Sequence, residues 1–485
     1  MFKRNSEFHA SRRTAILLAG ILFATVAASM PAARLGAATA PVKRPDQLVI
    51  LSTTDVKGKM SPCGCHVPKG GFSRRAAFAD SLRGDYGQMV IVDCGGWYPE
   101  GEDEYMEVAA FQAQELARSG ADAVGIGPRE LRYGLGFLRA VVAQSHLPVV
   151  SANLLDRVTH RLVLPAYRIV KAGGVTVGVF SLLSEHADLG PSRDSLVVAE
   201  PLSAARAAIV EMQAKGATVI VLLANMGKVD AEDLVATVDG VDALIAGFNV
   251  PLLQRGRMVK RTVTEFGGEQ GHYVGVTHLV LGPDQHVASG ESSTYILGPE
   301  VPERPEVLAR VKAFEDAFND HQRVRQKERT AAAMAASGEQ DESPSHYVGA
   351  EVCGRCHARE YAQWRSTPHA HALQTLASQK KDATPECLAC HAAGYGKPGG
   401  YASADDAAKM GGVQCESCHG IGTDHNAMPA AHATVGEAVC RGCHTENDSP
   451  GFKFEVYRPH VLHERPAVLP ELPARPNGAG MSGGH

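Results

Sequence analysis

The chain has 485 residues, with 48 Lys or Arg against 53 Asp or Glu, and a formal net charge of −5. This mild charge gives no electrostatic support for a nucleic-acid partner, and a composition of 44% hydrophobic and 21% charged residues excludes a disordered chain. Eight of the 11 cysteines and eleven of the 21 histidines lie between His346 and His463, so the chemistry of this segment differs from that of the rest.

The first 40 residues have the pattern of an export signal. Basic residues at positions 3, 4, 12 and 13 precede an apolar run, Ala15 to Ala28, and small residues follow through Ala40. The run is short for a membrane span of roughly 20 residues, although an uncut membrane anchor is the alternative. We therefore expect residues 1–40 to be a signal peptide. The mature protein should be periplasmic or extracellular, with peripheral membrane association at most.

Residues 46–300 are expected to form an α/β domain. Short apolar runs typical of buried strands alternate with helical stretches that end near Gly or Pro. The expected strands are 48–51, 89–92, 123–126, 148–150, 218–223 and 243–246. The expected helices are 104–118, 135–145 and 203–215, and the expected hairpins pair 167–170 with 175–182 and 272–281 with 293–297. This alternation indicates an α/β sandwich of about 250 residues.

Five short motifs at the strand ends of this domain align in order with metal-binding motifs. They read Asp55-Val-Lys57, Asp93-Cys-Gly-Gly96, Gly127-Pro-Arg-Glu130, Ala224-Asn225-Met-Gly227 and Gly247-Phe-Asn-Val250. On these motifs the domain resembles the metallophosphatases of the 5'-nucleotidase type. The resemblance implies a pair of metal ions held by Asp, His and Asn, which would activate water and clamp phosphate. Only Asp55 survives among those ligands, so we expect a degenerate domain that is not a dimetal phosphatase.

A group of thiols lies near the same strand ends. Cys63, Cys65 and His66 follow the first expected strand, and Cys94 ends the second. Because both strand ends lie at the carboxyl edge of such a sheet, these side chains are expected to converge. They could bind a soft metal or form a redox site. The alternative is structural, with one disulfide and one buried thiol, and both interpretations stay open.

A helix and a linker should occupy residues 301–345. The stretch from Pro305 to about Ser337 reads as one long helix with an apolar stripe, and a polar linker follows it. The stripe consists of Val307, Val311, Phe314 and Phe318. At the other end of the chain, residues 466–485 are rich in Pro and Gly and are expected to be a disordered tail.

The strongest signal is a Cys-x-x-Cys-His motif that occurs four times within residues 346–465. The copies are Cys353/Cys356/His357, Cys387/Cys390/His391, Cys415/Cys418/His419 and Cys440/Cys443/His444. In this spacing two thiols attach to the vinyl groups of one haem, and the adjacent imidazole ligates its iron. Zinc knuckles or disulfides are the alternative, but they would not require a histidine after every cysteine pair. We expect four c-type haems (heme c), and a domain of short helices and loops in which porphyrins supply the core.

Seven further histidines in this segment are candidates for the second axial position of the irons. They are His346, His369, His371, His425, His432, His460 and His463. The order and spacing of Trp364 and Ser366-Thr-Pro-His369, of Cys415-Glu-Ser-Cys-His-Gly420, and of Phe452-x-Phe454-x-x-Tyr457 resemble the tetrahaem cytochrome c-554 family. The resemblance implies His369, His425 and His463 as distal ligands. The fourth stays open between His371 and His432, and that family can leave one iron open.

Together these patterns predict a multihaem cytochrome in which electrons pass between redox partner proteins, a donor and an acceptor that the sequence does not identify. The front domain would bind a ligand or dock a partner. On this interpretation the chain is an electron-transfer protein and not an enzyme. The alternatives are a haem redox enzyme acting at an open iron, and a hydrolase or nucleotidase with an accessory cytochrome domain.

Overall fold

The computed structural model of the chain describes residues 46–62, 67–101, 103–336, 345–423, 435–445, 448–449, 451–463 and 469, without the side chains of 333–336. All of them belong to one compact unit, Lys43–His485. The expected signal peptide and almost all of the expected tail lie outside the described residues, as do Cys63, Cys65, His66, His425 and His432.

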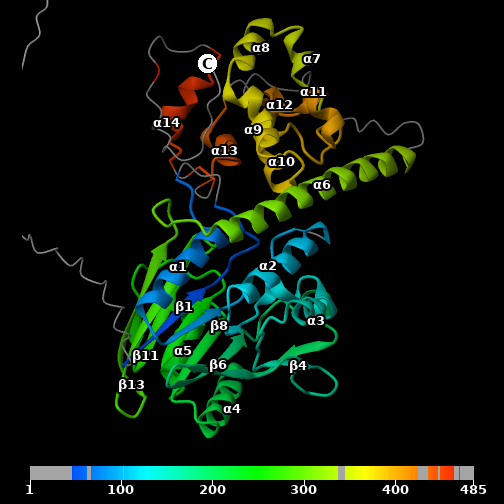
Figure 1. Cartoon of the computed structure of the whole chain (residues 1–485). Helices are drawn as coiled ribbons and strands as arrows, with labels where there is room; N and C mark the ends of the chain where they lie inside the picture. Colours follow the sequence, from blue (N-terminus) through cyan, green and yellow to red (C-terminus); the bar gives the residue numbers. More distant parts are fainter. Residues whose placement is uncertain are drawn as a thin grey trace, which may run out of the picture. The chain divides into compact units, whose positions relative to one another are not determined.

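Two mixed sheets form the front domain (Figure 1). The first sheet has the strand order β13-β12-β1-β2-β3 and the second β10-β11-β9-β8-β6-β5, while β4 and β7 pair separately. The first sheet consists of β1 (Gln47–Thr53), β2 (Met89–Asp93), β3 (Ala123–Val124), β12 (Tyr273–Leu281) and β13 (Val287–Ile296). The second consists of β5 (Tyr167–Ala172), β6 (Val175–Leu183), β8 (Val219–Asn225), β9 (Ala243–Gly247), β10 (Arg257–Val259) and β11 (Thr262–Phe266). The separate pair is β4 (Leu154–Asp156) with β7 (Leu196–Val198), which is antiparallel.

The central strands β1, β2, β8 and β9 are largely apolar because both of their faces are covered. In β1, Leu48 and Ile50 lie in the core between the two sheets, whereas Val49 and Leu51 point to the opposite face and pack with Ala79 of α1 (Phe72–Asp85). Alternate side chains of a strand point to opposite faces, so a strand buried on both sides needs no polar positions.

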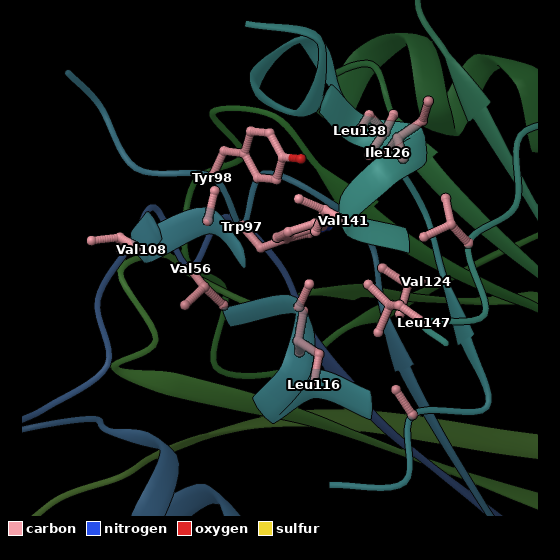
Figure 2. Packing of buried hydrophobic residues seen from close by; sticks show 14 of the residues in the cluster. Val56, Trp97, Tyr98, Val108, Leu116, Val124, Ile126, Leu138, Val141 and Leu147 are labelled. Carbon is pink, nitrogen blue, oxygen red and sulfur yellow. The ribbon is translucent and has the colours of Figure 1, made fainter. Parts of the chain in front are cut away.

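Helices cover the outer faces of both sheets. The second sheet is covered by α4 (Pro201–Ala214) and α5 (Lys228–Thr237). Beside the first sheet, α2 (Met106–Arg118) and α3 (Gly134–Ser145) enclose a cluster that contains the fully buried Trp97 and Tyr98 (Figure 2). Trp97 and Tyr98 follow β2 closely in the chain, so their burial in this cluster fixes the path of the chain at the carboxyl edge of the first sheet.

One long helix, α6 (Pro305–Ala336), follows the front domain. Its apolar stripe joins the same cluster, with Val307, Val311 and Phe318 buried and Phe314 stacked on Phe111 at 4.1 Å between ring centroids. Polar contacts add to this packing, since Arg310 pairs with the buried Glu115. The sequence prediction of a single helix from Pro305 with this stripe is confirmed.

The remainder of the chain folds into short helices and loops. They are α7 (Ala350–Gly354), α8 (Ala358–Arg365), α9 (Ala372–Ser378), α10 (Pro385–His391), α11 (Ala407–Met410), α12 (Cys415–His419), α13 (Glu437–Arg441) and α14 (Phe454–Tyr457). Their apolar core is small; its buried members are Tyr347, Leu373, Leu376, Leu388, Ala392, Ala393, Tyr401 and Met410. A small core is expected where a bound group supplies part of the packing.

The structure confirms the predicted fold class, an α/β sandwich followed by a mostly helical and irregular segment. One expected strand was wrong: residues 148–150 form only a single bridge, from Val149 to Val124. Helices α1 and α5 and strands β4, β7, β10 and β11 were not predicted. Helix α1 escaped detection because it buries Arg74 and Arg75 together with Phe72 and Ala76, so its sequence shows no clean apolar stripe. Within the described part of the chain, no helix combines the length and the apolarity that crossing a membrane requires.

Candidate functional site

Each Cys-x-x-Cys-His motif lies in, or at the end of, a short helix. The second motif ends α10 and the third spans α12, while the first and fourth begin near the ends of α7 and α13. Helical hydrogen bonds run through the motifs, for example from His357 N to Cys353 O and from His444 N to Cys440 O, both 2.9 Å. Positions i, i+3 and i+4 of a helix share one face, so each motif presents two thiols and one imidazole to the same side.

The motif cysteines are available for attachment. Each of the nine described cysteines, the eight of the motifs and Cys94, is a free thiol. Thiols of different motifs also approach one another: Cys390 contacts Cys443, and Cys353 contacts Cys415. Cys418 also lies close enough to Cys443 to act on its charge, which links the two pairs, so the four motifs gather in one small region.

Two histidines outside the motifs face motif histidines. The rings of His463 and His419 have centroids 6.1 Å apart, with planes 19° apart, and those of His369 and His444 are 6.2 Å and 42° apart. A metal ion bound by two imidazoles lies roughly 2 Å from a nitrogen of each, so these separations can accommodate one iron between the rings. The donor set and its spacing fit haem ligation on both sides of the iron.

The second ring nitrogen of several of these histidines already has a partner. His463 Nδ1 contacts Gln363 Oε1 at 3.1 Å, His444 Nδ1 contacts Ser449 Oγ at 3.1 Å, and His391 Nδ1 contacts the Ala372 carbonyl at 2.9 Å. A hydrogen bond at Nδ1 orients the ring and directs Nε2 to a metal. Sequence reasoning did not identify Gln363 and Ser449, which carry no motif signal.

Burial favours the neutral form of His369 and His463, which is the form that binds a metal. Burial, together with the nearby His444 and His391, lowers the pKa of His369. Burial and the neighbouring His419 likewise lower the pKa of His463. By contrast, His371 is exposed and its Nε2 contacts the Arg365 carbonyl at 3.1 Å, which suits an iron ligand less well.

A buried carboxylate holds the third motif in place. Glu416, between the two cysteines of that motif, accepts backbone N–H groups from Val348 (3.0 Å), Gly349 (2.8 Å) and Gly422 (2.7 Å). These contacts tie the start of the helical segment to α12. The sequence signals this role only by placing a charged residue inside the motif.

In the front domain, the strand ends converge at one edge, as expected. Asp55 is buried there; its Oδ2 accepts the Phe248 N–H and the Thr54 hydroxyl, both at 2.9 Å. Burial raises the pKa of Asp55, and the nearby Lys57 and Arg129 oppose that rise. Three of the aligned motifs therefore meet around this carboxyl group: the one after β1, the one after β3 and the one after β9.

Glycines and a buried glutamate surround Asp55. A Cβ on Gly96 would lie 2.4 Å from Asp55 Oδ1, so the Asp55 carboxyl occupies the space that a side chain at position 96 would need. Glu130 accepts four backbone N–H groups, from Gly96, Trp97, Tyr98 and Gly127, and burial raises its pKa to about 7. Among the residues with described positions, no group of three or more His, Cys, Asp or Glu side chains could hold a metal ion.

The structure places Cys94 in the core between the sheets. It is fully buried, and its thiol donates to the Ile245 carbonyl at 3.3 Å. Burial raises the pKa of Cys94 well above its usual range, which keeps it a protonated thiol. This geometry agrees with the interpretation of Cys94 as a structural thiol; the other three members of the expected cluster lie outside the described residues.

Comparisons with known proteins divide the chain into the same two parts. Residues 352–420 match the family model described as cytochrome c554 and c-prime. Cytochrome c-554 of Nitrosomonas europaea is 33% identical over 132 residues, which covers 23% of this chain and 56% of that protein. The 5'-nucleotidase of Bos taurus is 23% identical over 329 residues, which covers 59% of this chain and 56% of that protein. The chain thus spans little more than half the length of these relatives.

A solved structure supports the fold of the front domain. The sulfate thiohydrolase SoxB of Thermus thermophilus, in complex with glycerol, superimposes with a TM-score of 0.50 at 18% identity and covers 56% of this chain and 61% of that one. At this identity the likeness concerns the fold alone. Both resemblances predicted from the sequence, a cytochrome c-554 segment behind a 5'-nucleotidase-like domain, are confirmed.

Proposed function

From the cytochrome c-554 likeness of the C-terminal segment and the nucleotidase-like fold before it, we propose that the chain is an exported c-type cytochrome that carries electrons through four haems. Eight thiols, Cys353, Cys356, Cys387, Cys390, Cys415, Cys418, Cys440 and Cys443, would attach the haems. The motif histidines would be the proximal ligands. When bound, the haems supply reversible one-electron redox chemistry.

The observation that carries this proposal is that two pairs of imidazoles face each other. His463 opposite His419 and His369 opposite His444 leave room for one iron each and would give six-coordinate, low-spin centres. Two imidazoles on one iron block the binding of a substrate and favour electron transfer. His425 and His432, which are outside the described residues, remain candidates for the other irons. A haem enzyme acting at an open iron is the competing function.

We propose that the front domain has lost its metal ligands and serves to bind a ligand or to dock a redox partner. Supporting this, Gly96, Pro128, Arg129 and Phe248 stand where the aligned metal-binding motifs have donors, and none of these four side chains is a usual metal ligand. The proposed export rests on the pattern of residues 1–40.

Haem stoichiometry and spin state test the cytochrome proposal. The exported protein should retain four haems per chain by mass after denaturation and acid extraction, and its spectra should show at most one high-spin haem. A mass equal to that of the bare polypeptide would refute covalent attachment. Two or more open irons that bind and turn over small ligands would instead favour a haem enzyme.

A further inference from the structure

Two positively charged side chains stand where the aligned motifs of the front domain have metal-binding histidines. Lys57 takes the place of the histidine in Asp-x-His, and Arg129 that of the histidine in Gly-Asn-His-Glu. Both lie close enough to Asp55 and to Glu100 to act on the charge of each carboxylate. Positive charge has therefore been kept at this edge although the metal ligands are gone.

Both cations are paired with carboxylates that are more exposed than they are. Lys57, whose side chain is 16% exposed, pairs with Glu269 at 44%, and Arg129, at 21%, pairs with Glu100 at 72%. Exposed ion pairs contribute little stability, so these carboxylates can turn away into water at small cost. Lys57 and Arg129 can therefore exchange these carboxylates for another anion.

Asn225 and Arg129 each have buried polar atoms without a hydrogen-bond partner among the described residues. Asn225, at the end of β8, is 1% exposed, and in the part of the chain that the structure describes neither its Oδ1 nor its Nδ2 has a hydrogen-bond partner. Arg129 Nη1 is likewise buried and unpaired among the described residues. A buried polar group without a partner is costly, which points to water or a ligand at this position.

The Asn225 amide lies against the glycines of two neighbouring strand ends. A Cβ on Gly127 would lie 2.2 Å from Asn225 Oδ1, and one on Gly247 would lie 3.4 Å from its Nδ2 and 2.4 Å from Thr54 Oγ1. Since Thr54 donates to Asp55, the Asn225 amide and the Asp55 carboxyl belong to one cluster. The amide is therefore part of the same edge as the two cations.

Backbone strain gathers at this edge as well. Asp55, Lys57, Phe248 and Asn249 all have positive φ angles, of 49°, 52°, 74° and 57°. Non-glycine residues rarely adopt this conformation, and it persists where the surrounding structure holds it, commonly at binding sites. The strained residues thus lie in the loops after β1 and β9, and Lys57 is one of them.

We propose that this edge is a metal-independent site for a small oxyanion, held by Lys57, Arg129 and the Asn225 amide. The oxyanion is either a free inorganic ion or the phosphate group of an organic ligand. A guanidinium and an ammonium suit such an anion because charge-assisted hydrogen bonds are the strongest that side chains make. The inference rests on the proposed loss of the metal ligands.

Calorimetric titration of the full-length, haem-loaded protein tests this site. The titrants are sodium phosphate, sodium sulfate and AMP, in a low-salt buffer with EDTA to remove metals. We expect binding of at least one of them. The affinity should be roughly tenfold weaker in Lys57→Gln and in Arg129→Gln, and lost in the double variant. Arg132→Gln, which changes an exposed arginine near Glu100, is the matched control and should bind like the wild type.

Asn225→Ala adds a readout that separates binding from folding. Because its amide has no partner among the described residues, the substitution should leave the thermal midpoint without anion unchanged or higher, while it weakens binding. Binding of phosphate and sulfate alike identifies a general oxyanion site, and binding of AMP alone identifies a phosphoester ligand; both support the proposal.

Three results would overturn the oxyanion site: no binding of any titrant, equal binding by the double variant, or binding only after a divalent metal is added. Failure of the proposed function is recognised separately. Metal-dependent hydrolysis of AMP that Asp55→Ala abolishes would show a working metal centre, whereas absent binding without hydrolysis refutes the oxyanion site alone.

Discussion

A buried glutamate in the front domain should make its stability depend on pH. Glu265 on β11 is 1% exposed, accepts the Ser52 hydroxyl at 2.8 Å and lies 3.4 Å from the Thr294 hydroxyl. Burial raises the pKa of Glu265 from an ordinary 4.5 to about 7, and these hydroxyls only partly oppose the rise. Glutamine has nearly the same shape as glutamate but cannot ionise. We therefore expect Glu265→Gln to remove the pH-dependent contribution of Glu265 to the free energy of unfolding.

The sign and size of the effect of Glu265 on stability follow from the difference in its pKa between the folded and unfolded chains. The raised pKa means that Glu265 favours folding below pH 4.5, and that this contribution is lost as the pH rises through about 7. A difference of roughly 2.5 pKa units corresponds to about 3 kcal/mol when the loss is complete. Glu265→Gln should therefore stabilise the front domain by about 2–3 kcal/mol more at pH 8 than at pH 5.

Urea unfolding at the two pH values measures this difference. Of the two tryptophans, Trp97 lies in the front-domain core, so its fluorescence reports that domain once Trp364→Phe is present in all variants. Glu291→Gln, an exposed glutamate on β13, is the control and should not change the pH dependence. If wild type and Glu265→Gln lose stability equally between pH 5 and pH 8, the reasoning is refuted.

Three further substitutions test the packing and the haem ligands. His463→Ala should convert one haem towards high spin and raise its potential, as seen by electron paramagnetic resonance and redox titration, because it removes the imidazole opposite His419; an unchanged spectrum would show that His463 is not a ligand. His371→Ala is the control and should leave the spin state as it is. Trp97→Ala should destabilise the front domain by about 3–5 kcal/mol in thermal unfolding, because it leaves a cavity in a fully buried cluster; a loss below about 1 kcal/mol would contradict the packing described. Glu416→Ala should leave three backbone N–H groups without their acceptor and lower the midpoint of haem-segment unfolding at constant haem content, and an unchanged midpoint would contradict the anchoring role of Glu416.

The sequence determined those features whose physics is local. A Cys-x-x-Cys-His motif fits within about one helical turn, so its chemistry can be read without knowing the fold. The same holds for α6, whose stripe of Val307, Val311 and Phe318 repeats at helical spacing. Strands β1, β2, β8 and β9 were recognised from their apolar runs, because both of their faces are buried.

Elements with mixed composition escaped prediction because their partners come from elsewhere in the chain. Helix α1 buries Arg74 and Arg75, which no periodicity argument would place inside. Arg75 lies beside the buried Asp93 of β2, 3.9 Å away. Only the tertiary structure brings such a compensating charge to a buried one.

The pairing of histidines was also decided by the tertiary structure alone. The sequence proposed His369 and His463 as distal ligands, but not which iron each would serve. His463 faces His419, 44 positions earlier in the chain, and His369 faces His444, 75 positions later. Spacing along a chain of loops and short helices carries no information about such distant contacts. In the same way, the sequence motifs of the front domain contain Lys57, Arg129 and Asn225, whereas only the packing of the strand ends brought these residues to one edge.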